Sequence, residues 1–252
     1  MESLHDKITQ SYIDDVLVRL AHHSSALEGN KISLAETVTI ILDQTLPNNS
    51  KITNREYFEV LNHEQAFGLL LDNVNQGVPL SISVIKDMHA KITDRLQYDS
   101  GEFKKSSNYI RGAEFETAAP QDVPILLSQL IENLEYKIKI SKDNEDIVKA
   151  ILEFHISFEK IHPFSDGNER VGRLIMNYSL LENDLPFLVI RKEDKSEYNS
   201  ILHEGQTKLI LENQDIERFY EFASPLLAEE RKRLISFYEQ EQQLIQNEEL
   251  ER

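Results

Sequence analysis

The chain has 252 residues, 40% of them hydrophobic and 28% charged, which excludes a disordered chain and allows one sizeable core or at most two small domains. Its 27 basic and 44 acidic side chains give a formal net charge of −17, which opposes binding to nucleic acid or to an anionic membrane. The sequence contains no cysteine, no secretory-type leader pattern and no apolar run of membrane-spanning length, so we expect a cytoplasmic protein.

Apolar residues recur at helical spacing along most of the chain, which predicts a fold built almost wholly of helices. The expected helices span residues 8–26, 34–42, 54–73, 83–95, 125 to about 139, 145–160, 170–181 and 214 to the end. Gly29 ends the first helix, and Ser33 with Glu36 has the spacing of a capping box that opens the second. We expect three parts: an N-terminal helical region (1–50), a core (51–225) and a C-terminal helical extension (226–252).

Residues 99–120 depart from the helical pattern. Gly101 and Gly112 punctuate this segment, and Tyr109 and Ile110 between them favour an extended backbone. We therefore expect one small β-hairpin in an otherwise all-α fold.

One segment concentrates the residues that can do chemistry. Positions 162–173 read HPFSDGNERVGR and lie between a buried helix and the start of the next. The first N–H groups of a helix have no intrahelical acceptor and the helix dipole adds positive potential, so such a place attracts anions. Arg170 and Arg173 lie three residues apart and project from nearly one helical face. Two guanidiniums beside free amides indicate a site for two or more phosphates.

The same segment contains a carboxylate and an imidazole. Asp166 would repel a phosphate unless a divalent cation lay between them, and Mg²⁺ binds one or two carboxylates together with phosphate oxygens. Asp166 is therefore the candidate metal ligand. His162 can take a proton from an attacking hydroxyl, which makes it the candidate general base. The competing interpretation is structural, with His162 capping the preceding helix and the arginines in surface ion pairs.

The segment resembles the signature of Fic proteins, H-x-F-x-[DE]-G-N-G-R-x-x-R. The matching positions are His162, Phe164, Asp166, Gly167, Asn168, Arg170 and Arg173. The departure is Glu169, which stands where the pattern usually has Gly or Lys. Its backbone N–H suffices for phosphate binding if the carboxylate points away, whereas a carboxylate turned inward adds negative charge near the phosphates.

The resemblance implies a Fic-type helical bundle with a small β-hairpin flap. It also implies the activity of a protein adenylyltransferase, which moves AMP from ATP to a hydroxyl side chain of a target protein, with the chain itself among the candidate targets. ATP is then the substrate and Mg²⁺ the metal. The implied residues are His162 as base, Asp166 as Mg²⁺ ligand, Gly167, Asn168 and the amide of Glu169 on the phosphates, Arg170 and Arg173 on the β- and γ-phosphates, and Asn108, Tyr109, Ile110 and Arg111 in the target-docking flap.

A second match lies upstream, where residues 24–29 fit the inhibitory pattern [ST]-x-x-x-E-[GN] of the same family, with Ser24 and Glu28 at its defined positions. The resemblance implies that Glu28 pairs with Arg173 and displaces the γ-phosphate of ATP, the arrangement of the N-terminal inhibitory-helix class. It also implies that Glu28 can assist removal of AMP. By itself this stretch reads equally well as a polar helix end with Gly29 as terminator.

Several alternatives stay open at this stage. The chain could be a catalytically silent Fic scaffold that binds nucleotide or partners, or it could transfer another phosphate-linked group. Tyr198, which follows the motif helix, is a candidate for the adenine pocket, and a packed core aromatic is the competing interpretation. A homo-oligomer is compatible with the sequence, as are both directions of AMP transfer.

Overall fold

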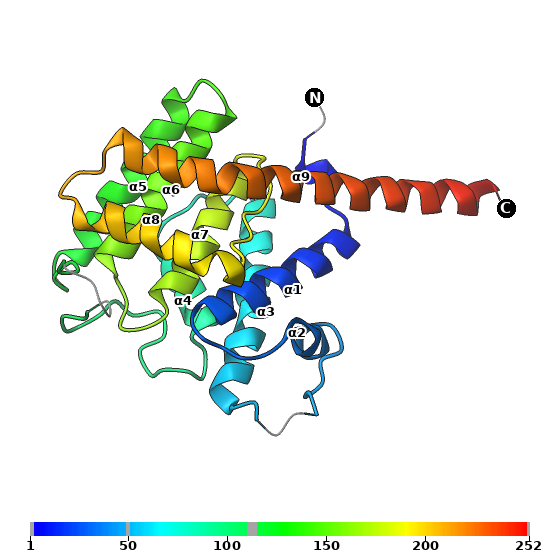
Figure 1. The fold of residues 1–252 in the computed structure, drawn as a ribbon, viewed down its shortest axis with the longest axis horizontal. Helices are drawn as coiled ribbons and strands as arrows, with labels where there is room; N and C mark the ends of the chain where they lie inside the picture. The colour runs from blue at the N-terminus through cyan, green and yellow to red at the C-terminus, as the bar shows by residue number, and fades with distance from the viewer. Residues whose placement is uncertain (1–2, 49–50, 110–114, 251–252) are drawn as a thin grey trace.

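The computed structural model describes residues 3–48, 51–109 and 115–250. Within them the chain forms nine α-helices and no strand, so the expected all-α architecture is confirmed (Figure 1). The helices are α1 (Gln10–Leu27), α2 (Leu34–Ile41), α3 (Asn54–Asn75), α4 (Ile82–Ile92), α5 (Val123–Ile140), α6 (Asn144–Ile161), α7 (Asn168–Glu182), α8 (Lys195–Thr207) and α9 (Asn213–Leu250). Two short 3-10 turns, η1 (His5–Lys7) and η2 (Lys192–Asp194), complete the described elements.

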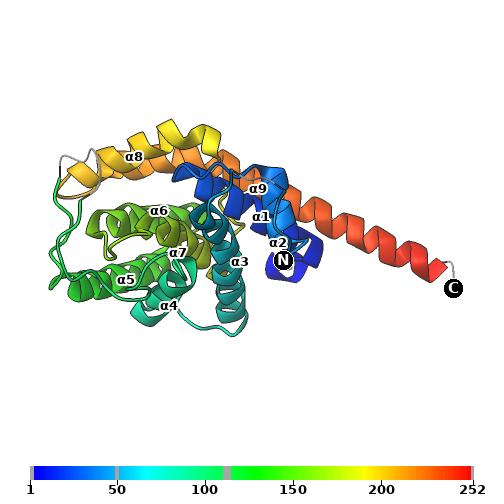
Figure 2. The same ribbon diagram turned by 90° about the horizontal axis from the view of Figure 1, so that it is seen from below.

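Helix α7 lies at the centre of the bundle. Thirteen of its 15 residues are buried, so it contacts protein on every side rather than along one stripe. Helices α3, α4 and α6 pack directly against it, and α8 and α9 cover the outer side of α6 (Figure 2). The loop at residues 162–167 therefore joins two buried helices and is held at both ends.

Local capping chemistry sets where the N-terminal helices begin and end. The predicted capping box is confirmed, because Ser33 Oγ accepts from the Glu36 N–H and the Glu36 carboxylate accepts from the Ser33 N–H. Thr53 and Glu56 make the same reciprocal pair at the start of α3. Helix α1 ends at Glu28, and Gly29 follows it with φ +97°, a left-handed conformation that favours glycine.

The predicted β-hairpin does not form in the described residues of 99–120, which contain no strand. Side chains make the links there. Lys104 Nζ donates to Asn108 Oδ1 at 2.7 Å and to Thr117 Oγ1 at 3.1 Å, and the backbone N–H of Lys104 donates to the carbonyl of Pro163 at 2.9 Å. Side-chain bonds thus join the two ends of this segment, and a backbone bond attaches it to the 162–167 loop. Ile110 and Arg111 lie outside the described residues.

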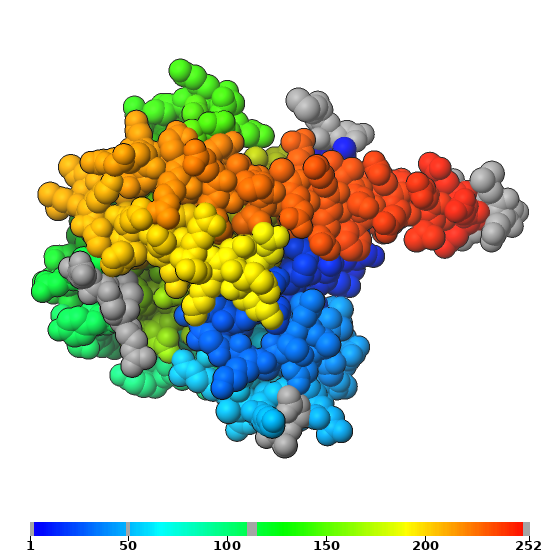
Figure 3. Space-filling model, in the orientation of Figure 1, coloured from blue at the N-terminus to red at the C-terminus, as the bar shows by residue number. Residues whose placement is uncertain are grey.

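One helix of the C-terminal third was not expected from the sequence: α8 was not predicted. The predicted helix from residue 214 onward is present as α9, which runs without a break from Asn213 to Leu250 although Pro225 lies inside it. The end of α9 extends beyond the body of the molecule (Figures 1 and 3). Among the described helices, none is long and apolar enough to cross a membrane.

Candidate active site

A tight loop between α6 and α7 carries the predicted site. His162 ends α6 in a left-handed conformation (φ 52°, ψ 62°), and Gly167 starts α7 with φ +80°. A Cβ on Gly167 would come within 2.8 Å of Thr93 Cγ2, so glycine is required both for its conformation and for space. These two left-handed residues reverse the chain direction within a few residues.

Side chains inside the loop fix its shape. Asn168 is 2% exposed; its Oδ1 accepts from the N–H of Phe164 at 2.8 Å and its Nδ2 donates to the carbonyl of Phe164 at 2.9 Å. The Phe164 ring stacks on His89, with ring centroids 3.7 Å apart. His89 Nδ1 accepts from the Gly101 N–H, so Nε2 carries the proton and donates to the carbonyl of Asp166 at 3.0 Å. The amide side chain of Asn168 is therefore used within the loop, and its backbone N–H remains for a ligand.

The loop opens into a pocket of about 340 Å³ at the start of α7. The pocket is lined by Glu28, Arg55, Glu59, Tyr109, His162 and residues 165–170. In the described residues no side chain caps α7, which leaves the first N–H groups of the helix available to an anion. Arg170 Nη1 is buried and has no hydrogen-bond partner within the described chain, which adds an unused donor beside these amides.

The imidazole of His162 has one nitrogen available to the pocket. Its Nδ1 lies 3.3 Å from the carbonyl oxygen of Glu159, which can only accept, so Nδ1 carries the proton and Nε2 keeps a lone pair. Burial, assisted by the charge of Lys104, lowers the pKa of His162 to about 4. The side chain is therefore neutral near pH 7 and ready to accept a proton.

Asp166 is accessible to a metal ion. It also forms an ion pair with Arg55, which the sequence did not indicate. Its side chain is 51% exposed. Oδ1 accepts from the Gly167 N–H at 2.7 Å, and Oδ2 accepts from Arg55 Nη2 at 2.8 Å. Although burial acts to raise it, the Arg55 hydrogen bond and the charge of Arg170 hold the pKa of Asp166 below its usual range. The group is thus an ionised carboxylate beside the free amides.

Arg173 is not among the residues that line this pocket, and it contacts the end of α1. Its Nη2 donates to Glu28 Oε1 at 2.8 Å and to the carbonyl of Ser24 at 3.1 Å, and its Nε donates to Ser24 Oγ at 3.0 Å. The Arg173 side chain is 6% exposed. Although burial acts to raise it, the charge of Arg173 holds the pKa of Glu28 below its usual range, so Glu28 is ionised. The structure therefore brings both residues of the upstream motif to the second motif arginine.

Glu169 does not point away from the site. Its Oε2 lies 3.8 Å from Arg173 Nη1, and its carboxyl group hydrogen-bonds that of Glu28. Burial and the charge of Glu28 raise the pKa of Glu169 to about 7. Two carboxyl groups from different helices thus face one guanidinium.

Two of the remaining sequence candidates lie elsewhere. Tyr198 is fully buried, and its hydroxyl is 2.6 Å from His155 Nε2 among other core aromatics, so the structure places it in the core and not in the pocket. Asn108 supports the loop, because its Nδ2 donates to the carbonyls of Phe164 at 2.7 Å and His162 at 3.3 Å. Tyr109 lines the pocket and is 83% exposed.

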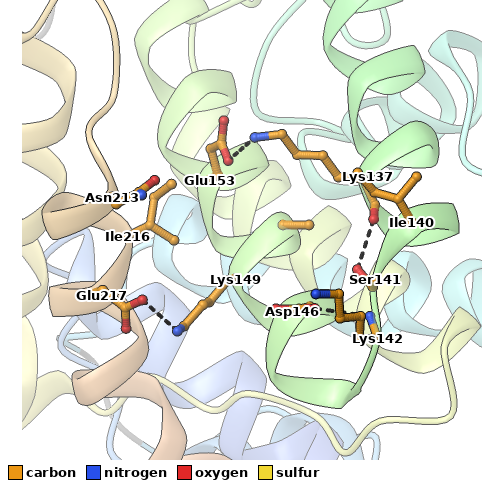
Figure 4. A pocket seen from close by; sticks show the side chains of 11 residues that line it. Lys137, Ile140, Ser141, Lys142, Asp146, Lys149, Glu153, Asn213, Ile216 and Glu217 are labelled. Carbon is orange, nitrogen blue, oxygen red and sulfur yellow. Dashed lines mark hydrogen bonds and ion pairs between the residues drawn. The ribbon is translucent and has the colours of Figure 1, made fainter.

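A second hollow lacks a comparable set of groups. The hollow in Figure 4, of about 350 Å³, lies between α5, α6 and α9. Two of its three lysines are paired, Lys137 with Glu153 and Lys149 with Glu217. Its lining residues include no histidine and no arginine. In the described part of the chain, the chemistry is concentrated at the start of α7.

Around the start of α7, the described residues thus combine a histidine base, an ionised carboxylate and buried arginine donors without a hydrogen-bond partner, a set suited to binding the phosphates of a nucleotide. Residues 79–180 match the Fic/DOC family, so the chain contains a Fic domain. The recognition made from the 162–173 motif is thereby confirmed.

Proteins similar in sequence carry related names. The chain is 27% identical over 184 residues to the protein adenylyltransferase Fic of Drosophila willistoni, covering 72% of this chain and 35% of that protein. It is 37% identical over 116 residues to a probable protein adenylyltransferase of Aquifex aeolicus, covering 46% of this chain and 34% of that protein. The chain thus spans about a third of the length of these curated relatives.

Solved structures share the fold. A Fic domain containing signaling protein from Bacteroides thetaiotaomicron superposes with a TM-score of 0.81 at 23% identity, covering 94% of this chain and 96% of that one. A fragment of Fic-1 from C. elegans has a TM-score of 0.76 at 20% identity, covering 94% and 71%. The helices outside the matched 79–180 segment are therefore part of a recurring arrangement.

Proposed function

We propose that this chain transfers AMP from ATP to a hydroxyl side chain of a protein, with the chain itself among the candidate targets. The observation that carries the proposal is the pocket at the start of α7, which combines uncapped amides, an unpartnered Arg170 donor and a neutral His162. The names of the relatives in Drosophila and Aquifex support the same reaction.

The chain's own residues account for each requirement of the transfer. The N–H groups at the start of α7, with Arg170 and Arg173, would hold the phosphates of ATP. The target hydroxyl oxygen then attacks the α-phosphorus, the bond from that phosphorus to the bridging oxygen breaks, and pyrophosphate leaves. His162 Nε2 accepts the hydroxyl proton as the new bond forms. The Nδ1–H bond to the Glu159 carbonyl keeps the ring oriented during this step.

Asp166 fits a Mg²⁺ ion that arrives with the nucleotide. It is a half-exposed, ionised carboxylate in the pocket, and Mg²⁺ commonly uses one protein carboxylate plus phosphate oxygens and water. Such an ion would supply positive charge to the phosphate oxygens. Arg55 would have to release Asp166 Oδ2 first, which costs little because the Arg55 side chain is 58% exposed.

The contact between Glu28 and Arg173 supports a resting state that is inhibited. A guanidinium paired with Glu28 and Ser24 has fewer donors for a terminal phosphate, so ATP would bind without its productive orientation. The same contact favours the second candidate function, a Fic scaffold that binds nucleotide or partners and transfers nothing. Release of AMP from a modified target is a further reaction that Glu28 could assist in this place.

Mass spectrometry of the Glu28→Gly protein after incubation with ATP and Mg²⁺ tests the proposal. We expect a mass increase of one AMP per modified hydroxyl, on the chain or on an added target, and no increase in the matched Glu28→Gly/His162→Ala protein. Nucleotide binding without any AMP transfer would favour the scaffold instead. Competition with other nucleotides would reveal transfer of a different phosphate-linked group.

A further inference from the structure

Glu169 is positioned to compete for Arg173 from within the motif itself. It is the second residue of α7 and stands four residues before Arg173, a spacing at which a carboxylate and a guanidinium meet on one helical face. Glu169 Oε2 is 3.8 Å from Arg173 Nη1. That nitrogen is buried and, within the described residues, has no hydrogen-bond partner. Glu169 is thus the carboxylate that faces the unused arm of the guanidinium.

Glu28 currently keeps Glu169 from completing this pair. The Glu28 carboxylate accepts a hydrogen bond from Arg173 Nη2 at 2.8 Å. It also hydrogen-bonds the carboxyl group of Glu169, and this second bond requires that one of the two acids carries a proton. The charge of Glu28 is one of the causes that favour the neutral form of Glu169. If Glu28 leaves, its repulsion and its hydrogen bond leave with it, and the ionised form of Glu169 beside Arg173 becomes favoured.

We propose that Glu169 is a second inhibitory carboxylate, which takes the freed donors of Arg173 when Glu28 is withdrawn and continues to exclude the terminal phosphate of ATP. This inference rests on the proposed function of the pocket as an ATP site. It follows that removing Glu28 alone relieves only part of the inhibition. Full access to Arg173 requires Glu169 to lose its charge or to be displaced.

The geometry leaves Glu169 no equally good partner elsewhere. Its side chain is 39% exposed and lines the pocket, so an ionised Glu169 would lie where phosphate oxygens have to bind. The charged side chains around it include Glu28, Arg173 and Lys195, and its charge also raises the pKa of the buried Glu159. A lysine that approached more closely could draw it away, but no ion pair between Lys195 and Glu169 forms in the described structure.

Calorimetric titration of Mg²⁺-ATP into four proteins tests the inference. The proteins are the parent chain, Glu28→Gly, Glu169→Gln and Glu28→Gly/Glu169→Gln. We expect the double variant to bind at least about tenfold more tightly than Glu28→Gly, and Glu169→Gln alone to stay within about threefold of the parent because Glu28 still holds Arg173. Glu221→Gln in the Glu28→Gly background, at an exposed position of α9, is the control for the change in net charge.

The outcomes separate the inference from the function on which it rests. Equal affinities of Glu28→Gly and the double variant would overturn the role of Glu169 while leaving ATP binding intact. Absence of ATP binding to every variant, with cooperative thermal unfolding retained, would overturn both. If the glutamine substitution perturbs folding, Glu28→Gly/Glu169→Gly, which carries the glycine usual in the signature, provides the second measurement under the same criteria.

Discussion

The protonation of individual side chains determines what the pocket can do at neutral pH. His162 is neutral because burial lowers its pKa to about 4, and Asp166 is ionised because Arg55 and Arg170 stabilise its charge. Glu169 has a pKa near 7 because burial and the charge of Glu28 oppose its ionisation. The pocket thus holds a neutral base (His162), an ionised carboxylate (Asp166) and a half-protonated acid (Glu169), and the immediate surroundings of each group determine its pKa.

Protonation of His162 should not slow AMP transfer in mild acid. A base with a pKa of about 4 remains almost wholly deprotonated at pH 5.5, whereas a histidine with the ordinary pKa near 6.5 would be about tenfold less available there. We expect the labelling rate from α-labelled ATP to change by less than about twofold between pH 7.5 and 5.5. The measurement uses Glu28→Gly/Glu169→Gln, so that neither acid titrates in this range. A tenfold fall would contradict a lowered pKa for His162.

Among the elements, the segment before α5 acts as a support for the catalytic loop. The Asn108 side chain donates from Nδ2 to the carbonyls of Phe164 and His162, and its Oδ1 accepts from Lys104 Nζ. The pKa of Lys104 is lowered to about 8 by burial, which shows how enclosed this junction is. The loop therefore depends on residues some 55 positions upstream for its shape.

Replacing Asn108 with alanine should loosen the loop without unfolding the bundle. The change leaves two partly buried carbonyls and the Lys104 ammonium with fewer partners, a loss of about 1–3 kcal/mol. We expect hydrogen exchange of the amides at 162–168 to accelerate at least about tenfold while amides in the middle of α7 exchange as before. Thr207→Ala is the control, because Thr207 is exposed at the end of α8 and its side chain bonds only the Glu204 carbonyl within the described structure. Unchanged exchange at 162–168 would show that the loop does not need this support.

The sequence predicted those elements and residues that lie in continuous patterns. The loop signature was recognisable because its residues fall within twelve consecutive positions, and eight of the nine helices were predicted because their apolar faces are regular. Arg55 could not be assigned, since it meets Asp166 only through packing across 111 positions. Helix α8 was missed because its apolar residues are few among polar ones. The hairpin prediction is not confirmed in the described residues of 99–120, where side-chain bonds rather than strand pairing link the segment.

At the scale of the whole molecule, a local cluster of arginines opposes the overall charge. The chain carries a formal net charge of −17, yet Arg55, Arg170 and Arg173 converge on the start of α7. Their guanidiniums, with the helix dipole, supply positive charge at the start of α7, where they also pair with the carboxylates of Glu28 and Asp166. Phosphates are thus attracted at one place, while a polyanion such as nucleic acid would be repelled by the rest of the surface.

The sequence-based prediction starts a C-terminal extension at residue 226, and several α9 side chains beyond that position are packed against the rest of the molecule. Leu226, Leu227 and Leu234 are buried, and Glu230 pairs with Arg19 at 2.7 Å with a side chain only 4% exposed. Beyond 239, the described side chains up to 248 are exposed or half-buried. We therefore infer that the packed part of α9 extends to about Tyr238.

Two truncations distinguish these boundaries. A chain ending at Gln240 should unfold within about 2 °C of the parent, because it keeps every buried side chain of α9. A chain ending at Pro225 loses three buried leucines, about 1.5–3 kcal/mol each, and leaves Arg19 without its buried partner, a further cost of about 3–5 kcal/mol. Since such losses match the total stability of a typical domain, we expect no cooperative thermal transition for this shorter chain. Scanning calorimetry or far-UV circular dichroism measures both, and equal midpoints for the two truncations would return the boundary to residue 226.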